Sequence, residues 1–258
     1  MAVATDELLY IHVPKTGGTF VEAVLQRVYA SRPGSFIDTS RPQDRGRFGH
    51  RNQHDPLERI PEPWRSKPLL ATVRNPYDHH VSLYEFGWWK HHEHDTFDPG
   101  RIRLRYPHFP ELSFPEYLAA VNDWNLVDPS AAPAGLFPTL GSHSFGLLSL
   151  GYLQYLCADP DGVLADLPGL LASGGLARSF APGTWIPMNR LNSGLHAFLR
   201  SLGHAEPELE FILDMAPVLP EGGTRASRRF LDYYDARSLE LVRERERLLF
   251  ELFPEFEA

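Results

Sequence analysis

The segment that most constrains the fold is residues 8–19, where an apolar run, a turn and a helix follow one another. Residues 8–13 read LLYIHV and predict a short buried strand. Pro14 and the following glycines interrupt the strand, and Thr19 opens a helix. Apolar residues at i, i+3, i+4 and i+7 give this helix one apolar face: Val21, Val24, Leu25 and Val28. A buried strand that turns directly into such a helix indicates an α/β protein.

The rest of the chain continues the alternation of strands and helices. We expect further strands over 35–38, 68–73 and 184–188. Helices are expected over 76–90, 113–122, 144–157, 191–202 and 232–253, and a mostly irregular segment over 91–115. Asn75 is placed to cap the second helix, with Pro76 at its first position. We see no linker that would separate domains. The prediction is a P-loop-like three-layer fold, with a mainly parallel central sheet flanked by helices, in one domain over residues 1–258.

Composition excludes several classes of protein. The chain has 258 residues and is 43% hydrophobic, which is enough to form a core and argues against a disordered tail. A formal net charge of −8 argues against a general nucleic-acid binder. The single cysteine, Cys157, allows no internal disulfide. No apolar run approaches the roughly 20 residues that span a bilayer, so we expect a cytoplasmic protein without a transmembrane segment. The oligomeric state is left open.

The turn after the first strand has the composition of an anion site. Backbone N–H groups at the start of a helix attract anions, and Gly17 and Gly18 let a ligand approach the backbone closely. Thr16 and Thr19 supply hydroxyl groups, and Lys15 supplies a cation. The alternative is an ordinary strand-to-helix turn in which the glycines serve the backbone alone.

The order of residues in this turn differs from that of a Walker A loop. Walker A loops place Gly-Lys-Ser/Thr at the end of the turn, and the Ser/Thr holds Mg²⁺. Here Lys15 precedes the glycines. A group less charged than a γ-phosphoryl, such as a sulfuryl group, would suit a loop with one lysine and no metal ligand. The rival hypotheses are an ATP-dependent P-loop phosphotransferase and a non-catalytic nucleotide-binding module.

The turn resembles the 5′-phosphosulfate-binding loop of sulfotransferases that use 3′-phosphoadenosine 5′-phosphosulfate (PAPS). It is most similar to the branch that contains the heparan and uronyl 2-O-sulfotransferases and their soluble bacterial relatives. The resemblance implies that PAPS is the cofactor and PAP the product. It also implies that Lys15 stabilises the leaving phosphate. The residues it assigns to the 5′-phosphosulfate are Pro14, Lys15, Thr16, Gly17, Gly18 and Thr19.

A second string, residues 72–84, resembles the 3′-phosphate-binding motif of the same family. Arg74 follows an apolar strand, where a guanidinium fork suits a phosphate. Ser82 is assigned to the 3′-phosphate by the resemblance alone, since a serine two turns into a helix is otherwise expected to face solvent. The chain differs from the family at His79 and His80, where Arg-Leu is commoner, and we expect this to affect packing rather than cofactor binding.

A weaker similarity lies ahead of the last helix. Relatives carry a serine-containing basic loop that closes over the nucleotide, and this chain has Arg225, Ser227 and Arg228 in the same place. The resemblance would assign these three residues to the cofactor. The alternative is a solvated basic loop that offsets the acidic stretch 206–221.

Transfer to an acceptor hydroxyl requires a general base with a pKa near the working pH. The related 2-O-sulfotransferases place a histidine between the two cofactor motifs, often as Gly-His. His50 follows Gly49 and is our first candidate, and His54 is the second. Glu58 is the carboxylate alternative, because other branches of the family use a glutamate in this stretch.

The remaining expectations concern the acceptor and metals. The acceptor would be a hydroxyl-bearing carbohydrate, glycolipid or small metabolite. Trp88 lies on the apolar stripe of its helix and is expected in the core, which leaves Trp89 as the candidate for stacking against a sugar. His91 to Asp95 contain three histidines, but neighbouring residues of one helix cannot converge on an ion, so no metal site is expected.

Overall fold

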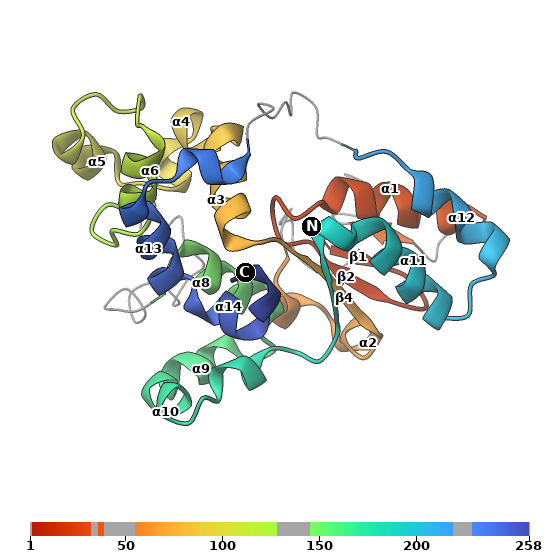
Figure 1. The fold of residues 1–258 in the computed structure, drawn as a ribbon. Coiled ribbons are helices and arrows are strands. Elements are labelled where there is room, and N and C mark those ends of the chain that lie inside the picture. The colour runs from red at the N-terminus through yellow and green to blue at the C-terminus, as the bar shows by residue number, and fades with distance from the viewer. Residues whose placement is uncertain (1, 32–35, 39–54, 128–144, 219–228, 258) are drawn as a thin grey trace. The chain divides into compact units, whose positions relative to one another are not determined.

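The computed structural model describes residues 2–31, 36–38, 55–127, 145–218 and 229–257 (Figure 1). The chain groups into two compact units, each assembled from separated segments. Unit 1 contains residues 1–74, 155–158 and 181–224, and unit 2 contains residues 75–154, 159–180 and 225–258. The single sulfotransferase domain over residues 1–258 stays a prediction.

Unit 1 contains a five-stranded sheet with the strand order β3-β1-β2-β4-β5. The strands are β1 (Ala2–Ala4), β2 (Leu9–Ile11), β3 (Ile37–Asp38), β4 (Leu69–Val73) and β5 (Thr184–Pro187). β4 pairs in parallel with β2 and with β5, whereas β1 pairs antiparallel with β2 and with β3. The α/β class is therefore confirmed. The expectation of a mainly parallel sheet is wrong, because the sheet is mixed.

The antiparallel part of the sheet begins at a tight turn between β1 and β2. The N–H of Thr5 donates to the carbonyl of Leu8 across 2.9 Å. The Thr5 hydroxyl accepts from the N–H groups of Glu7 and Leu8, both at 3.1 Å. A turn this short joins only antiparallel strands, because a parallel pair needs a crossover connection. The local turn therefore forces β1 to run against β2.

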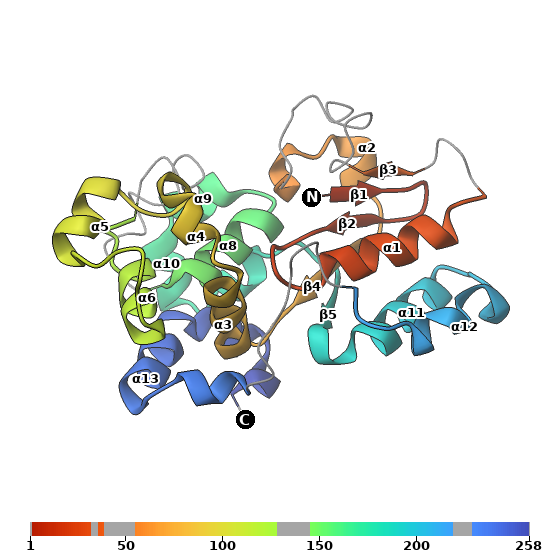
Figure 2. The same ribbon diagram turned by 90° about the horizontal axis from the view of Figure 1, so that it is seen from above.

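Three helices cover one face of this sheet. They are α1 (Gly18–Val28), α11 (Leu191–Ser201) and α12 (Glu206–Asp214) (Figures 1 and 2). Their apolar residues share a buried core with Tyr10, Leu70 and Ile186 of the strands. Every residue of β1, β2 and β4 is buried, so the other face of these strands is covered too. The short α2 (Glu62–Arg65) precedes β4.

Unit 2 is helical. Its helices are α3 (Pro76–Phe86), α4 (Trp88–His91), α5 (Pro99–Arg105), α6 (Phe114–Val121), α9 (Pro160–Ala165), α10 (Leu167–Ala172), α13 (Ala236–Arg245) and α14 (Arg247–Leu252), together with most of α8 (Leu147–Leu156). The predicted cap of α3 is confirmed, since the Asn75 side chain accepts from the N–H of Tyr77 at 2.9 Å. α5 lies in a segment expected to be irregular, and Asp98 caps it by accepting from two backbone N–H groups.

The helix expected over 232–253 is interrupted at Glu246. This residue has φ −101° and ψ 20°, and it separates α13 from α14. Its carboxylate is fully buried. Oε1 accepts from the N–H of Leu148 at 3.2 Å, and Oε2 accepts from the N–H of Ser149 at 2.7 Å. The carboxylate thus caps the N-terminus of α8 from the break between two other helices.

A histidine completes the surroundings of this carboxylate. The Nε2 of His80 lies 3.0 Å from Oε1 of Glu246, and both side chains are fully buried. His80 lies on α3, so one acidic group connects α3, α8 and the α13–α14 junction. The break in the helix at Glu246 directs its carboxylate toward His80 and toward the N–H groups of Leu148 and Ser149.

The two neighbouring tryptophans take the opposite places to those expected. Trp88 is 47% exposed, whereas Trp89 is 3% exposed and lies in the core. Gly87 adopts φ +67°, which ends α3 and starts α4 with a new register. Because the helical period does not continue across Gly87, the apolar stripe of α3 does not predict the orientation of Trp88. Trp89 is therefore not a sugar-stacking candidate.

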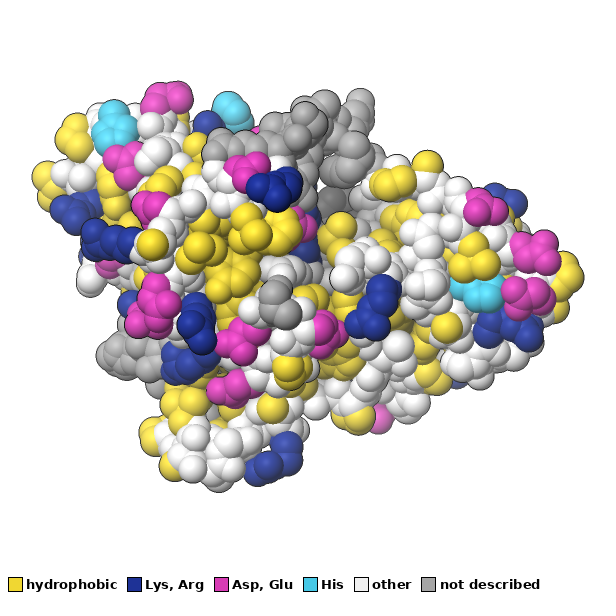
Figure 3. Space-filling view, viewed as in Figure 1, with side chains coloured by type: hydrophobic (Ala, Val, Ile, Leu, Met, Phe, Trp, Pro, Cys, Tyr) yellow, Lys and Arg dark blue, Asp and Glu magenta, His cyan; other side chains and the backbone are white. Residues whose placement is uncertain are grey.

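On the one face shown in Figure 3, charged side chains are spread rather than gathered. Lys and Arg side chains are interspersed with Asp and Glu on the face shown in Figure 3. This pattern agrees with the moderate formal net charge of −8. Within the residues that the structure describes, no helix is both long enough and apolar enough to cross a membrane.

Candidate phosphate-binding site

The turn between β2 and α1 has an unusual backbone. Lys15 has φ +63°, and Gly17, the N-cap of α1, has φ +92° and ψ 17°. Left-handed backbone suits Gly17 but is strained at a lysine. Alternation of left- and right-handed residues turns successive N–H groups toward one side, which makes a concave anion site. The left-handed residues Lys15 and Gly17 give the loop a backbone that can present N–H groups to an anion, and its role as an anion site stays a prediction.

The first N–H groups of α1 are unused within the described part of the chain. Those of Gly17, Gly18 and Thr19 donate to no acceptor there, whereas the next two, of Phe20 and Val21, donate to the carbonyl of Gly17. The Gly17 cap supplies no side-chain acceptor. Three unpaired donors at the positive end of a helix favour an oxyanion ligand.

Side chains would not fit at the two glycines. A Cβ at Gly17 would lie 2.8 Å from Cδ2 of Leu191, and a Cβ at Gly18 would lie 2.1 Å from Nε2 of His12. The His12 ring thus forms a floor directly under the start of α1. Burial is the main cause that lowers the pKa of His12 to about 3, so this floor is uncharged at neutral pH.

The hydroxyl of Thr16 points into the fold. It donates to the carbonyl of Val13 at 2.6 Å and lies 2.7 Å from the Thr72 hydroxyl, which lies 3.1 Å from the Tyr10 hydroxyl. Since the only Thr16 hydroxyl proton goes to a carbonyl, Thr16 accepts from Thr72, and Thr72 in turn accepts from Tyr10. Thr16 therefore offers a ligand its backbone rather than its hydroxyl, in contrast to our expectation.

Arg74 supports the loop from the neighbouring strand. It follows β4 directly, is 7% exposed, and its Nη1 donates to the carbonyl of Lys15 at 2.9 Å. Burial and, secondarily, the charge of Arg74 lower the pKa of Lys15 to about 8. Two cations are thus held close together at the carboxyl edge of two parallel strands. A bound anion would relieve their repulsion.

The remaining predicted residues lie elsewhere. Ser82 is half-buried on α3 and belongs to unit 2, whereas the loop and Arg74 belong to unit 1. Glu58 lies in a short 3-10 turn, Leu57–Arg59, and its carboxylate is 3.8 Å from the Arg59 guanidinium. The other candidates lie outside the described residues: His50, His54, Arg225, Ser227 and Arg228. Their assignments, and that of Ser82, stay predictions.

Three supporting residues were not singled out from the sequence as parts of the site. They are Tyr10, His12 and Thr72, whose side chains hold the loop from below. The only signal for them is a polar side chain inside an otherwise apolar strand, which ordinarily indicates a satisfied core residue.

Comparisons with protein-family models, with curated proteins and with solved structures found no match to this chain.

Proposed function

We propose that the chain is a PAPS-dependent sulfotransferase that moves a sulfuryl group to an acceptor hydroxyl. The observation that carries the proposal is the loop of residues 14–19, in which three N–H groups that donate to no acceptor among the described residues lie beside Lys15 and Arg74. This arrangement suits a compact oxyanion approached through its backbone. The resemblance of residues 14–19 and 72–84 to the two cofactor motifs of PAPS-dependent sulfotransferases favours PAPS over other nucleotides, and with it a P-loop-like fold.

In the proposed reaction, the residues of the chain would have the following separate roles. The N–H groups of Gly17, Gly18 and Thr19 hold the 5′-phosphate, and the Lys15 ammonium stabilises charge that develops on the bridging oxygen. PAPS supplies an activated sulfuryl group, whose bond to the phosphate oxygen breaks as the acceptor oxygen bonds to sulfur. His50 takes the acceptor's proton, with His54 and Glu58 as alternatives.

The 3′-phosphate identifies the nucleotide. By the resemblance we assign it to Arg74 and Ser82, with Arg225, Ser227 and Arg228 as further cofactor-binding residues. The acceptor would be a carbohydrate or glycolipid hydroxyl, or the hydroxyl of a small metabolite. An ATP-dependent phosphotransferase is the alternative, although the loop lacks the Gly-Lys-Ser/Thr order that places a hydroxyl on Mg²⁺.

Thermal-shift titrations with PAP, AMP and ATP plus Mg²⁺ test the proposal. We expect PAP to raise the melting temperature more than AMP, because only PAP carries a 3′-phosphate. Lys15→Ala should remove most of the shift, whereas Lys90→Ala, which deletes a lysine of unit 2, should not. Stabilisation by ATP plus Mg²⁺ with none by PAP would overturn the sulfotransferase proposal in favour of the phosphotransferase.

Turnover distinguishes an enzyme from a binding module. Radiolabelled PAPS, offered with saccharide, lipid and metabolite fractions, should label an acceptor with the wild-type chain. His50→Ala should bind PAP normally and fail to transfer. If His50→Ala transfers at the wild-type rate, the base is His54 or Glu58. PAP binding without transfer to any fraction would indicate a non-catalytic nucleotide-binding module.

A further inference from the structure

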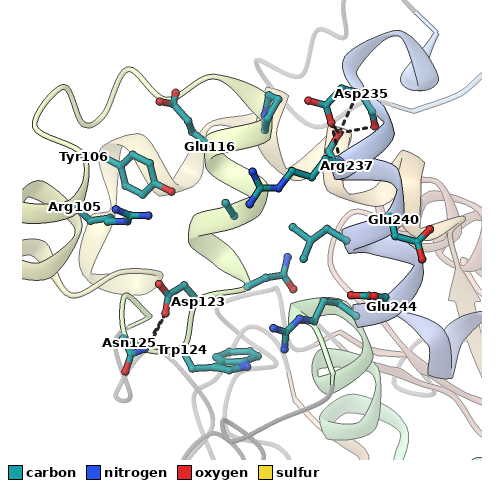
Figure 4. Close-up of a pocket in the computed structure, with 16 residues that line it drawn as sticks. Arg105, Tyr106, Glu116, Asp123, Trp124, Asn125, Asp235, Arg237, Glu240 and Glu244 are labelled. Atoms are coloured by element: carbon teal, nitrogen blue, oxygen red, sulfur yellow. Dashed lines mark hydrogen bonds between the residues drawn. The ribbon is translucent and has the colours of Figure 1, made fainter.

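A cavity of about 990 Å³ lies within unit 2, among α5, α6, the segment that follows α6, and α13 (Figure 4). Every residue of its lining has a polar or aromatic side chain except Pro115, Ala119 and Leu241. Pockets for small molecules are ordinarily lined mainly by apolar side chains, with a few polar groups that orient the ligand. A lining this polar therefore suits a ligand that carries hydrogen-bonding groups over most of its surface.

The charged groups of this lining are of both signs. Three arginines and five carboxylates border the cavity. Neighbouring groups act on one another there: hydrogen bonds from Ser238 chiefly, and secondarily Arg237, lower the pKa of Asp235. A charged ligand of either sign would meet like charges as well as opposite ones. A neutral ligand would instead meet both donors and acceptors of hydrogen bonds.

The mixture of donors and acceptors is clearest around Tyr106, which directly follows α5. Burial is the main cause that raises the pKa of its phenol. The charge of Arg105 opposes this rise, and the charges of Glu116 and Asp123 add to it. The phenol stays protonated at neutral pH, so its hydroxyl can both donate and accept hydrogen bonds. One hydroxyl, one guanidinium and two carboxylates thus act on the same part of the cavity.

Two aromatic rings also belong to the lining. They are those of Tyr106 and of Trp124, on the segment that follows α6, and both side chains are half-buried (Figure 4). Beside Trp124, the Asn125 amide donates to the Asp123 carboxylate across 3.1 Å, which fixes two planar polar groups next to the indole. The face of an aromatic ring carries partial negative charge and attracts polarised C–H groups. A pyranose ring presents such C–H groups on its faces and hydroxyl groups at its edge.

We propose that this cavity binds a neutral carbohydrate, a short oligosaccharide of pyranose units. The rings of Tyr106 and Trp124 stack against sugar C–H groups. The Asp123 carboxylate and the Arg237 guanidinium, which points into the cavity in Figure 4, form hydrogen bonds with neighbouring sugar hydroxyls. A volume of about 990 Å³ lies at the upper end of the range for small-molecule sites, about 300–1,000 Å³, and so favours more than one sugar unit.

This site stands apart from the proposed sulfotransfer. The cavity shares no residue with the loop of residues 14–19, and its lining belongs to unit 2. The proposal concerns binding alone, so its test needs no PAPS and does not depend on whether the chain transfers a sulfuryl group.

Isothermal titration calorimetry with trisaccharides of different charge tests the proposal. Maltotriose, cellotriose and chitotriose are the neutral probes. Deacetylated chitotriose is the cationic probe, and trigalacturonate is the anionic probe. We expect at least one neutral probe to bind with a Kd near or below about 1 mM, and more tightly than either charged probe.

Variants of the chain locate the binding. Tyr106→Ala and Arg237→Ala should each weaken binding of the best neutral probe about fivefold. Tyr106→Phe keeps the ring and should lose less than Tyr106→Ala. Arg243→Ala removes the same charge from the same helix outside the cavity, and Trp88→Ala removes an aromatic side chain that is 47% exposed outside it. Both controls should bind as the wild type does.

The outcomes separate the cavity from other surfaces. Losses in Tyr106→Ala and Arg237→Ala with both controls unchanged support the proposal. No binding by any neutral probe overturns it, and so does tighter binding by a charged probe than by every neutral one. An equal loss in Trp88→Ala or Arg243→Ala also overturns it, because the sugar would then bind elsewhere. If circular dichroism shows that Tyr106→Ala does not fold, Arg237→Ala, at an exposed position, decides the test.

Discussion

The guanidinium of Arg74 donates to the backbone carbonyl of Lys15 across 2.9 Å, which links the end of β4 to the turn after β2. Lys15 has φ +63°, a strained conformation for a lysine. Arg74 therefore helps to hold the backbone that presents the unpaired N–H groups. In the proposed function, the Arg74 side chain would both hold the loop in place and bind the phosphate of the ligand.

Arg74→Lys should weaken PAP binding about tenfold or more. A lysine keeps the charge but lacks the planar fork that reaches a carbonyl and a phosphate at once. The measurement is the Kd for PAP by calorimetry. Arg65→Lys, in an exposed ion pair with Glu62, is the matched control and should bind PAP as the wild type does. An unchanged Kd in Arg74→Lys would show that the fork is not used.

PAP affinity should fall as the pH rises from 7 to 9. Burial, then Arg74, lowers the pKa of Lys15 to about 8, so the free chain loses this positive charge as the pH passes 8. A bound phosphate favours the charged form, and binding must then take up a proton. The Kd should rise by up to about tenfold per pH unit above pH 8. Lys15→Arg, which stays charged, should flatten the profile. A flat wild-type profile would contradict the prediction.

Thr72→Val should lower the free energy of unfolding by about 1–3 kcal/mol. The substitution keeps the shape of the side chain but removes the hydroxyl that lies between Tyr10 and Thr16. PAP affinity should fall too, because Thr16 then loses a partner that fixes the loop. Urea unfolding measures the first effect and calorimetry the second. Thr184→Val, at an exposed position of β5, should change stability by less than about 0.5 kcal/mol.

Gly18→Ala should destabilise the chain by about 1–3 kcal/mol. The new Cβ would lie 2.1 Å from Nε2 of His12, which is buried and has little room to move. Gly151→Ala is the control, because nothing lies within 4 Å of a Cβ there and alanine favours a helix. In a double-mutant cycle, His12→Ala should reduce the cost of Gly18→Ala. Additive losses would mean that the two residues are not in contact.

Glu246→Gln should lower the free energy of unfolding by about 1.5–3 kcal/mol. Both carboxylate oxygens accept N–H groups at the start of α8, and an amide offers one oxygen in their place. Glu244→Gln, two residues earlier and exposed, should have little effect. Equal unfolding free energies for the two variants, by chemical denaturation, would show that the cap adds no stability.

The parts of the fold that local chemistry decides were predictable. The apolar runs locate β2, β4 and β5, and Asn75 with Pro76 begins α3 as expected. The turn between β2 and α1 was predictable for the same reason, since Gly17 and Gly18 lie where the backbone is left-handed or crowded.

Other features depend on contacts that no short window of sequence contains. The break at Glu246 occurs because its carboxylate meets α8 and His80, which lie far away in the chain. The hydroxyl chain below the loop joins Tyr10 to Thr72 across two strands. Gly87 resets the helix register, which exchanges the expected places of Trp88 and Trp89. In each case a distant partner or a single backbone angle overrides the local pattern.

The way the chain passes between its two units limits how it can be divided. β4 ends at Val73 and its neighbour β5 begins at Thr184, and most of unit 2 is built from the residues between them. A fragment of residues 1–74 would lack β5, α11 and α12, and a fragment of residues 75–180 would lack α13 and α14. No single cut releases either unit whole. Either unit could therefore be moved into another protein only as several separate segments of chain, never as one contiguous piece.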